Sequence, residues 1–279
     1  MAKMQKAFVQ EKEFEELIEI NNEETILKFK QDIAKIISKD IKLKAKNDSQ
    51  RDLIHSIKNN EITICSGMAG SGKTFVSLAY ALSLLRKLGN RYKNIYLVKS
   101  VTTLKDEELG FLKGDLKEKF DPYMMSFYIN MEKIITETTM KMLLDKGIIR
   151  PFPLAFIKGT SLDDCIIIAD EMQNITLNNA RILLTRIGSN SKLILLGDTN
   201  QIDIKEEDSS LYPLLKMYGD VDKIGTLHMS DDDDNVRNPL IKIIEEKFKE
   251  YYIENKLNRN GNNKNYGLSG NTGTKNTKQ

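Results

Sequence analysis

Four short apolar runs recur along the chain, and none of them alternates polar with apolar residues as a half-exposed strand would. They are EITICSG at 61–67, NIYLVKS at 94–100, DCIIIADE at 164–171 and KLILLGD at 192–198. Flat Ile, Leu and Val runs are typical of strands covered on both faces, and longer helical segments lie between them. The pattern therefore predicts one α/β domain over residues 47–255, with a parallel sheet between two layers of helices.

Both ends of the chain differ from this central pattern. Residues 1–46 are expected to form a helical element that packs on the core. The apolar positions that support it share the three- and four-residue spacing of one helical face, and they are Ile26, Phe29, Ile33, Ile36 and Ile37. Residues 256–279 are mostly Asn, Gly, Thr and Lys with almost nothing to bury, which predicts a disordered tail.

Composition restricts the class of protein. Of 279 residues, 40% are hydrophobic and 29% charged, and no apolar run has the length of a membrane span. The start of the chain lacks the apolar block and cleavage site of a secretory signal, so we expect an intracellular, cytoplasmic protein with no membrane partner. Cys65 and Cys165 lie in apolar runs, which predicts two buried thiols and leaves too few cysteines for a zinc ribbon.

Charge is distributed unevenly. The formal net charge is +2, but residues 256–279 carry five basic residues and no acidic one, which leaves residues 1–255 at −3. The molecule as a whole is therefore not a polycation. The tail alone has the basic character that binds nucleic-acid phosphates, and an idle solubilising tail is the alternative.

The run GMAGSGKT at 67–74 matches the phosphate-loop pattern G-x-x-x-x-G-K-[ST]. It lies between the first apolar run and a helical segment, which is the context that the pattern requires. Glycines let backbone N–H groups converge on a triphosphate, Lys73 brings charge to the terminal phosphates, and the Thr74 hydroxyl can ligate magnesium. The predicted ATP and Mg²⁺ site therefore includes Gly67, Met68, Ala69, Gly70, Ser71, Gly72, Lys73 and Thr74.

Polar residues follow two further predicted strands. Asp170 stands at the end of the third run, where ligands of open α/β sheets bind, and is the expected second magnesium ligand. Glu171 comes next and is the candidate general base for the attacking water. After the fourth run, the amide of Gln201 can bond the γ-phosphate or that water and lose the bond after cleavage.

Together these motifs resemble a known family. GMAGSGKT, the DE-x-Q element at 170–173, LLTRIG at 183–188 and GDTNQID at 197–203 occur in this order in PhoH-like ATPases, relatives of the first ATPase domain of superfamily 1 helicases. Two further segments, LGFLKGDLKEKFDPY at 109–123 and NVRNPL at 235–240, are similar as well. The resemblance covers about residues 47–250 and implies a RecA-like P-loop fold and magnesium-dependent hydrolysis of ATP.

The resemblance also implies roles that the spacing alone does not mark. Gln50 lies where related helicases hold an adenine-reading glutamine, and Gln173 of the DE-x-Q element is expected at the nucleotide. Arg237 and Arg186 are alternative candidates for stabilising charge on the transferring phosphate, and a structural ion pair is the other interpretation of Arg186.

The chain departs from the family pattern at two places. Lys99-Ser100 stands where an Arg-Pro pair is common, and Asn238 occupies a position often held by another residue. A lysine keeps the positive charge but lacks the planar fork of arginine. We therefore do not assign to Lys99-Ser100 any phosphate or nucleic-acid contact that the family makes at this strand end.

Expected partners follow from what a single domain lacks. A superfamily 1 helicase binds ATP between two such domains, whereas the motifs occur once in this chain. The resemblance therefore implies a homo-oligomer, with a hexameric ring as the family form, in which a neighbouring subunit completes the site. The helicase-like motifs and the basic tail also favour coupling to RNA or single-stranded DNA.

Two other functions are compatible with a phosphate loop. A thymidine-kinase-like phosphotransferase has a similar DE-x-Q strand end, but it also carries a zinc ribbon and leaves LTRIG and GD-x-x-Q-ID unexplained. The second alternative is an ATP-gated binding module that hydrolyses little ATP. For that module the acidic run Asp231–Asp234 is either a docking site for a basic partner or a solvated loop.

Overall fold

The computed structural model describes residues 23–37, 41, 43–87, 89–99, 116–229, 240, 243–244, 246–248 and 250–251. The chain divides into two compact units, Met1–Asp234, which holds the sheet, and Asn235–Gln279, whose described residues are helical. The tail at 256–279, the acidic run at 231–234, Ser100, Arg237 and Asn238 lie outside the described residues. The expected domain limits at 46/47 and 255/256 stay predictions.

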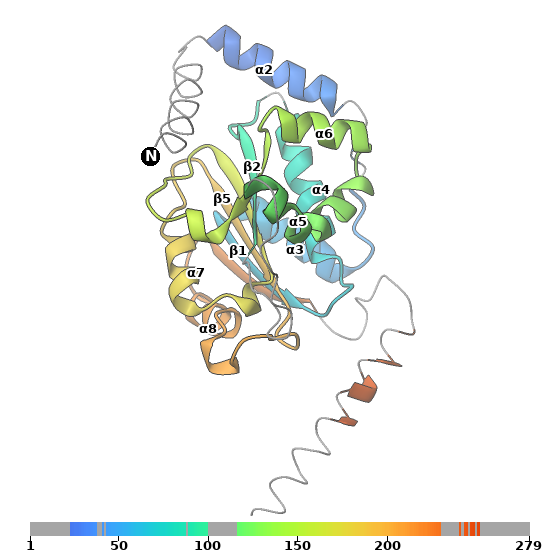
Figure 1. The fold of residues 1–279 in the computed structure, drawn as a ribbon, viewed down its shortest axis with the longest axis vertical. Helices are drawn as coiled ribbons and strands as arrows, with labels where there is room; N and C mark the ends of the chain where they lie inside the picture. The colour runs from blue at the N-terminus through green and yellow to red at the C-terminus, as the bar shows by residue number, and fades with distance from the viewer. Residues whose placement is uncertain are drawn as a thin grey trace, which may run out of the picture. The chain divides into compact units, whose positions relative to one another are not determined.

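Among the described residues, six strands form one sheet in the order β3-β2-β4-β5-β1-β6, and every neighbouring pair is parallel (Figure 1). The four predicted strands are confirmed as β1 (Ile62–Gly67), β2 (Asn94–Lys99), β4 (Cys165–Asp170) and β5 (Lys192–Gly197). The edge strands β3 (Ile149–Pro153) and β6 (Ile224–Met229) are not among the predicted ones. Since parallel strands share one carboxyl edge, Lys99 and Asp170, which end β2 and β4, and the segments that follow β1 and β5 come to the same edge.

Helices cover both faces of this sheet (Figure 1). On one face pack α2 (Glu23–Ile36), α3 (Asp48–Asn59), α4 (Lys73–Arg86), α5 (Leu116–Glu132) and α6 (Glu137–Asp145), and on the other α7 (Leu177–Leu184) and α8 (Leu211–Met217). Short 3₁₀ turns, η1 (Leu154–Phe156), η2 (Met172–Asn174) and η3 (Glu206–Asp208), lie in the connections. The predicted α/β class, with a parallel sheet and helices on both faces, is thereby confirmed.

Strand β4 shows why its sequence is a flat apolar run. Ile166 and Ile168 belong to the core on the α4 side, and Ile167 belongs to the core on the α7 side. Successive side chains of a strand point to opposite faces, so a strand covered twice needs an apolar residue at every position. Burial of each isoleucine contributes roughly 1.5–3 kcal/mol.

Local signals also place the helices. Asn47 caps α3, since its Oδ1 accepts a hydrogen bond from the Gln50 N–H at 2.9 Å, and such a cap is worth about 1 kcal/mol. In the N-terminal element, Ile33 and Ile37 are buried on the core and Ile36 packs against it, which confirms that part of the predicted apolar face. Phe29 was predicted on the same face but is exposed, and the Ile26 side chain lies outside the described residues.

The predicted state of the cysteines is confirmed, because Cys65 and Cys165 are both buried thiols. Within the described part of the chain, no helix combines the length and the apolar character that crossing a membrane requires.

Candidate nucleotide-binding site

The phosphate loop connects β1 to α4 at the carboxyl edge of the sheet. Gly70 and Gly72 have φ values of 93° and 91°, a region that side chains with a Cβ rarely adopt. At Gly67 a Cβ would lie 2.8 Å from the Cβ of Met229 on the neighbouring strand β6. The glycines of the motif are therefore required by the backbone path of the loop itself.

Lys73 is the first residue of α4, and its ammonium group turns back into the loop. Its Nζ donates to the carbonyl oxygens of Gly67 at 2.5 Å and Met68 at 2.8 Å, and to Ser71 Oγ at 3.3 Å. The lysine side chain is buried. A positive charge is thus held inside the loop, at the place where the sequence predicts phosphates.

Thr74 and Asp170 meet between α4 and β4. The Thr74 Oγ1 donates to Asp170 Oδ2 at 2.9 Å, and Asp170 is buried. These two oxygens are of the kind that Mg²⁺ prefers, and Mg²⁺ usually keeps waters and takes phosphate oxygens as further ligands. The described residues contain no group of three or more His, Cys, Asp or Glu side chains that could hold a metal. A metal at Thr74 and Asp170 would therefore also need water and phosphate oxygens as ligands. The donor set fits magnesium together with a nucleotide.

Glu171 follows Asp170 in an unusual backbone conformation. Its φ of 60° is left-handed, and its N–H donates to Asp170 Oδ1 at 3.0 Å. Left-handed backbone costs a non-glycine residue roughly 1–2 kcal/mol and tends to persist at functional sites. Burial, and next the charge of Asp170, raise the pKa of Glu171, while Lys99 and a hydrogen bond from Gln173 act in the opposite direction.

Lys99, at the end of β2, belongs to the site although sequence reasoning assigns it no role. It lies directly beside Asp170 in the β2–β4 pairing, and its Nζ lies 3.9 Å from Glu171 Oε1 and donates to Ser126 Oγ of α5 at 3.0 Å. The strand-end position, shared with Asp170 and Gly197, is the signal that could have marked it. Lys99 supplies a second positive charge beside the candidate base.

Gln173, in η2, connects the ends of β4 and β5. Its Nε2 donates to Glu171 Oε2 at 2.6 Å, and its Oε1 accepts from the Asp198 N–H at 3.0 Å. Asp198 in turn accepts from the N–H of Ala69 in the phosphate loop at 2.9 Å through Oδ2. The expected contact of Gln173 with a nucleotide stays a prediction.

Gln50 of α3 lies against the phosphate loop. The side chain is buried, its Nε2 donates to the Ser71 carbonyl at 3.0 Å, and its Oε1 accepts from the Lys46 N–H at 2.9 Å. The loop and the amide predicted to read adenine are therefore adjacent. Reading a base would require the amide to exchange these two bonds, and this role stays a prediction.

Of the remaining predicted residues, Gln201 reaches this cluster only through its backbone, and Arg186 lies apart from it. The side chain of Gln201 is exposed, and its N–H donates to the Asp198 carbonyl at 3.2 Å. The Arg186 carbonyl accepts from the Leu162 N–H at 3.0 Å, so Arg186 lies where the chain enters β4, at the opposite end of the strand from Asp170. Its Nε is buried and has no hydrogen-bond partner among the described residues. Arg237 lies outside the described residues.

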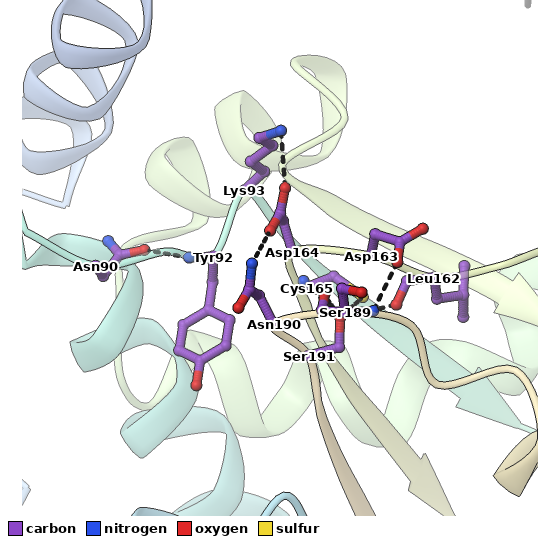
Figure 2. A network of polar contacts seen from close by, with 10 residues as sticks. All are labelled: Asn90, Tyr92, Lys93, Leu162, Asp163, Asp164, Cys165, Ser189, Asn190 and Ser191. Atoms are coloured by element: carbon purple, nitrogen blue, oxygen red, sulfur yellow. Dashed lines mark hydrogen bonds and ion pairs between the residues drawn. The ribbon is translucent and has the colours of Figure 1, made fainter. Parts of the chain in front are cut away.

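The end of the LLTRIG motif contributes to a polar network at this opposite edge of the sheet. Figure 2 shows Asp164 between Lys93 and Asn190, at 3.0 and 3.2 Å, and Asp163 accepting from the Ser189 N–H at 2.7 Å. A Cβ on Gly188 would collide with the Asp163 carboxylate. The glycine of this motif is therefore required for packing, away from the phosphate loop.

His228 of β6 is a second neighbour of the loop that sequence reasoning missed. Its Nδ1 lies 2.8 Å from Ser66 Oγ, and Ser66 immediately precedes the loop. Because β6 is not among the predicted strands, no signal in the sequence placed this histidine beside β1.

The family model of PhoH-like proteins matches residues 42–249. The chain belongs to the PhoH-like protein family. The resemblance seen in the motifs is thereby confirmed. Relatives include the PhoH-like protein of Bacillus subtilis strain 168, which is 37% identical over 205 residues that cover 73% of this chain and 63% of the relative. Protein PhoH of Escherichia coli K12 is 30% identical over 192 residues, covering 68% of this chain and 53% of that protein.

This PhoH-like chain therefore aligns with only part of its relatives, less than two thirds of the Bacillus subtilis protein and about half of the Escherichia coli one. Its similarity to solved structures is remote. A large terminase from a thermophilic bacteriophage, in complex with ADP, has a TM-score of 0.37 at 12% identity, over 70% of this chain and 48% of the terminase. The Sulfolobus solfataricus SWI2/SNF2 ATPase core in complex with dsDNA has a TM-score of 0.35 at 15% identity, over 60% of this chain and 34% of that core.

Proposed function

We propose that this PhoH-like protein binds ATP and Mg²⁺ at the phosphate loop and hydrolyses ATP to ADP and phosphate. The observation that carries the proposal is the 2.9 Å hydrogen bond from Thr74 Oγ1 to Asp170 Oδ2. It joins the end of the phosphate loop to the end of β4, so two oxygen ligands for Mg²⁺ converge beside the buried ammonium of Lys73.

Binding would use groups that are already directed into the loop. The backbone N–H groups of the loop and the N-terminus of α4 favour a phosphate, and Lys73 would exchange the carbonyls of Gly67 and Met68 for phosphate oxygens. Bound Mg²⁺, held by Thr74 and Asp170, would neutralise charge on the phosphate oxygens. Gln50 would read the adenine edge, and Gln201 would bond the γ-phosphate or the attacking water.

Hydrolysis would be an in-line displacement at the γ-phosphorus. The oxygen of water forms a bond to that phosphorus, the bond to the β–γ bridging oxygen breaks, and ADP leaves with the electron pair. The proton of the water passes to a Glu171 carboxylate oxygen. Burial and the nearby Asp170 raise the pKa of Glu171, which makes this carboxylate a better proton acceptor at neutral pH.

A neighbouring subunit would complete the site. The motifs for one ATPase domain occur in this chain, and a homo-oligomer, as a hexameric ring, would bring a second wall to the nucleotide. Arg186 lies at the opposite end of β4 from Asp170, so if it is the arginine that acts on the phosphate it would serve a neighbour's site, and Arg237 is the alternative. Light scattering tests this, and a monomer with full ATPase activity would refute it.

Coupling to RNA or single-stranded DNA is the finer part of the proposal. Its support is the set of helicase-like motifs and the basic residues at 256–279. Oligonucleotides should then stimulate phosphate release at low salt, and the stimulation should disappear as salt rises. Indifference to every nucleic acid tested would remove the coupling and leave the ATPase.

The first experiment compares phosphate release by the wild type and by Lys73→Ala. The wild type should release phosphate from ATP, and Lys73→Ala should lose at least about 99% of that rate, because the terminal phosphates lose their charge partner. Equal rates in the two proteins would exclude the proposed ATPase. Transfer of phosphate to thymidine instead of water would indicate the kinase alternative.

A further inference from the structure

Gln173 uses both ends of its amide on protein groups. The 2.6 Å bond from Nε2 reaches Glu171 Oε2, and the 3.0 Å bond to Oε1 comes from the Asp198 N–H. The side chain is fully buried, so solvent cannot replace either bond. Since a glutamine amide offers one acceptor oxygen beside its N–H donors, this side chain spans from the candidate base to the end of β5.

The contacts continue from β5 to the phosphate loop. Asp198 Oδ2 accepts from the Ala69 N–H at 2.9 Å, and Asp198 Oδ1 accepts from the Asn200 N–H at 2.9 Å. Asp198 is itself buried. Hydrogen bonds to a charged acceptor are roughly twice as strong as neutral ones, so this carboxylate is held firmly. Ala69, Asp198, Gln173 and Glu171 therefore form one continuous line of hydrogen bonds.

Space for the Gln173 amide depends on Gly197. A Cβ at this position would lie 2.6 Å from Gln173 Oε1 and 2.7 Å from Leu211 Cδ2, both closer than normal contact. Only glycine at position 197 leaves room for the Gln173 amide in its present position. Gly197→Ala therefore perturbs the same contact while leaving the Gln173 side chain in the protein.

We infer that Gln173 is a positioning residue, which holds Glu171 in a fixed relation to the phosphate loop through Asp198 and does not bind the nucleotide itself. Glu171 needs such support because its backbone is left-handed and the ammonium of its ion-pair partner, Lys99, is as far as 3.9 Å away. The inference rests on the proposed function, from which Glu171 takes its role as base. A direct contact of Gln173 with the nucleotide, as the resemblance implies, is the alternative.

Amide hydrogen exchange tests the geometry without any turnover. In Gln173→Met, which is similar in size but has no amide, the Asp198 N–H should exchange at least about tenfold faster than in the wild type. Gln173→Glu keeps an acceptor oxygen, so the Asp198 N–H should stay protected. Unchanged exchange in Gln173→Met would overturn the inference.

Steady-state kinetics separate positioning from nucleotide binding. Gln173→Met should lower kcat for ATP hydrolysis about 10- to 100-fold while KM changes less than about threefold, since only the base is displaced. Gln173→Glu should lose kcat as well, because a carboxylate there repels Glu171. Gly197→Ala should resemble Gln173→Met. A raised KM with normal kcat in Gln173→Met would instead indicate a nucleotide contact and overturn the inference.

Asn174→Ala is the matched control. Asn174 lies next to Gln173 and exchanges two 2.7 Å hydrogen bonds with Asp203, but neither bond reaches Glu171. Its kcat should stay within about threefold of the wild type. An equal loss of kcat in Asn174→Ala and Gln173→Met would show general loosening of the loop and contradict a specific role for Gln173.

Phosphate release by the wild type and hydrogen exchange at the Asp198 N–H distinguish an error in the proposed function from an error about Gln173. A wild type that releases no phosphate rejects the ATPase, while the exchange of the Asp198 N–H still decides whether Gln173 holds that strand end. If the wild type hydrolyses ATP and Gln173→Met has the same kcat, the positioning role is rejected while the ATPase stands. Cooperative melting of Gln173→Met and Gln173→Glu shows that each variant is folded.

Discussion

The Thr74 hydroxyl donates a hydrogen bond to the Asp170 carboxylate at 2.9 Å, although the two residues are 96 positions apart in the sequence. The pair forms because α4 begins at the end of β1, and β4 ends at the same edge of the sheet. This relation turns two separate sequence motifs into a single candidate site for magnesium and phosphate.

Thr74→Ala should weaken the binding of magnesium at the proposed site. We expect kcat for ATP hydrolysis to fall about 100-fold and the Mg²⁺ concentration for half-maximal rate to rise, because one of two protein ligands is lost. Thr74→Ser keeps the hydroxyl and should stay within about fivefold of the wild type. Phosphate release measured over a Mg²⁺ titration distinguishes them, and identical titrations for Ala and Ser would contradict the role of the hydroxyl.

Lys99 is predicted to act through its charge. Lys99→Met should lower kcat about tenfold, because loss of the ammonium 3.9 Å from Glu171 favours the protonated carboxyl, which cannot accept a proton from water, while Lys99→Arg should retain most activity. The control is Ser126→Ala, which removes the 3.0 Å partner of Lys99 and leaves its charge. Equal activity of Lys99→Met and the wild type would show that this lysine has no part in the reaction.

Cys165 should resist alkylation in the folded protein. Burial raises the pKa of its thiol to about 11, so at pH 8 only about one molecule in a thousand carries the reactive thiolate. Reaction with a thiol-specific reagent should be slow at pH 8, should accelerate as pH rises toward the pKa, and should become rapid in denaturant. Rapid modification of the native protein at pH 7 would contradict the buried environment.

Gly188→Ala should affect folding and not the nucleotide site. The new methyl group would lie 2.9 Å from the Leu162 carbonyl oxygen and collide with the Asp163 carboxylate, and overpacking against the backbone costs about 1–3 kcal/mol. Urea denaturation should show the loss, while KM for ATP should be unchanged in the folded fraction. Gly89→Ala is a suitable comparison, because a Cβ there meets no atom within 4 Å.

The central strands and the loop can be located from sequence because these elements carry strong local signals. The runs that form β1, β2, β4 and β5 are flat and apolar, as doubly covered strands must be. β3 escapes prediction because its sequence, IRPFP, contains two prolines, which only an edge strand tolerates. β6 escapes because half-buried IGTLHM has neither a flat apolar run nor a clear alternation.

Contacts between distant segments cannot be predicted in the same way. The motif gives no sign that the Gln173 side chain accepts a hydrogen bond from the Asp198 backbone, 25 positions away. Lys99 is a departure from a family pattern when the sequence is taken alone, and only its pairing with Asp170 places it beside Glu171. Such roles depend on strand order, which the order of motifs does not reveal.

The most direct test of the central claim is phosphate release from ATP by the wild type and by Asp170→Asn at increasing Mg²⁺. Asparagine keeps an oxygen that can accept from Thr74 but loses the charge that holds the metal. The wild type should release phosphate only when Mg²⁺ is present, and a folded Asp170→Asn should lose at least about 99% of that rate. Equal rates for the two proteins, or a wild-type rate that EDTA does not change, would contradict it.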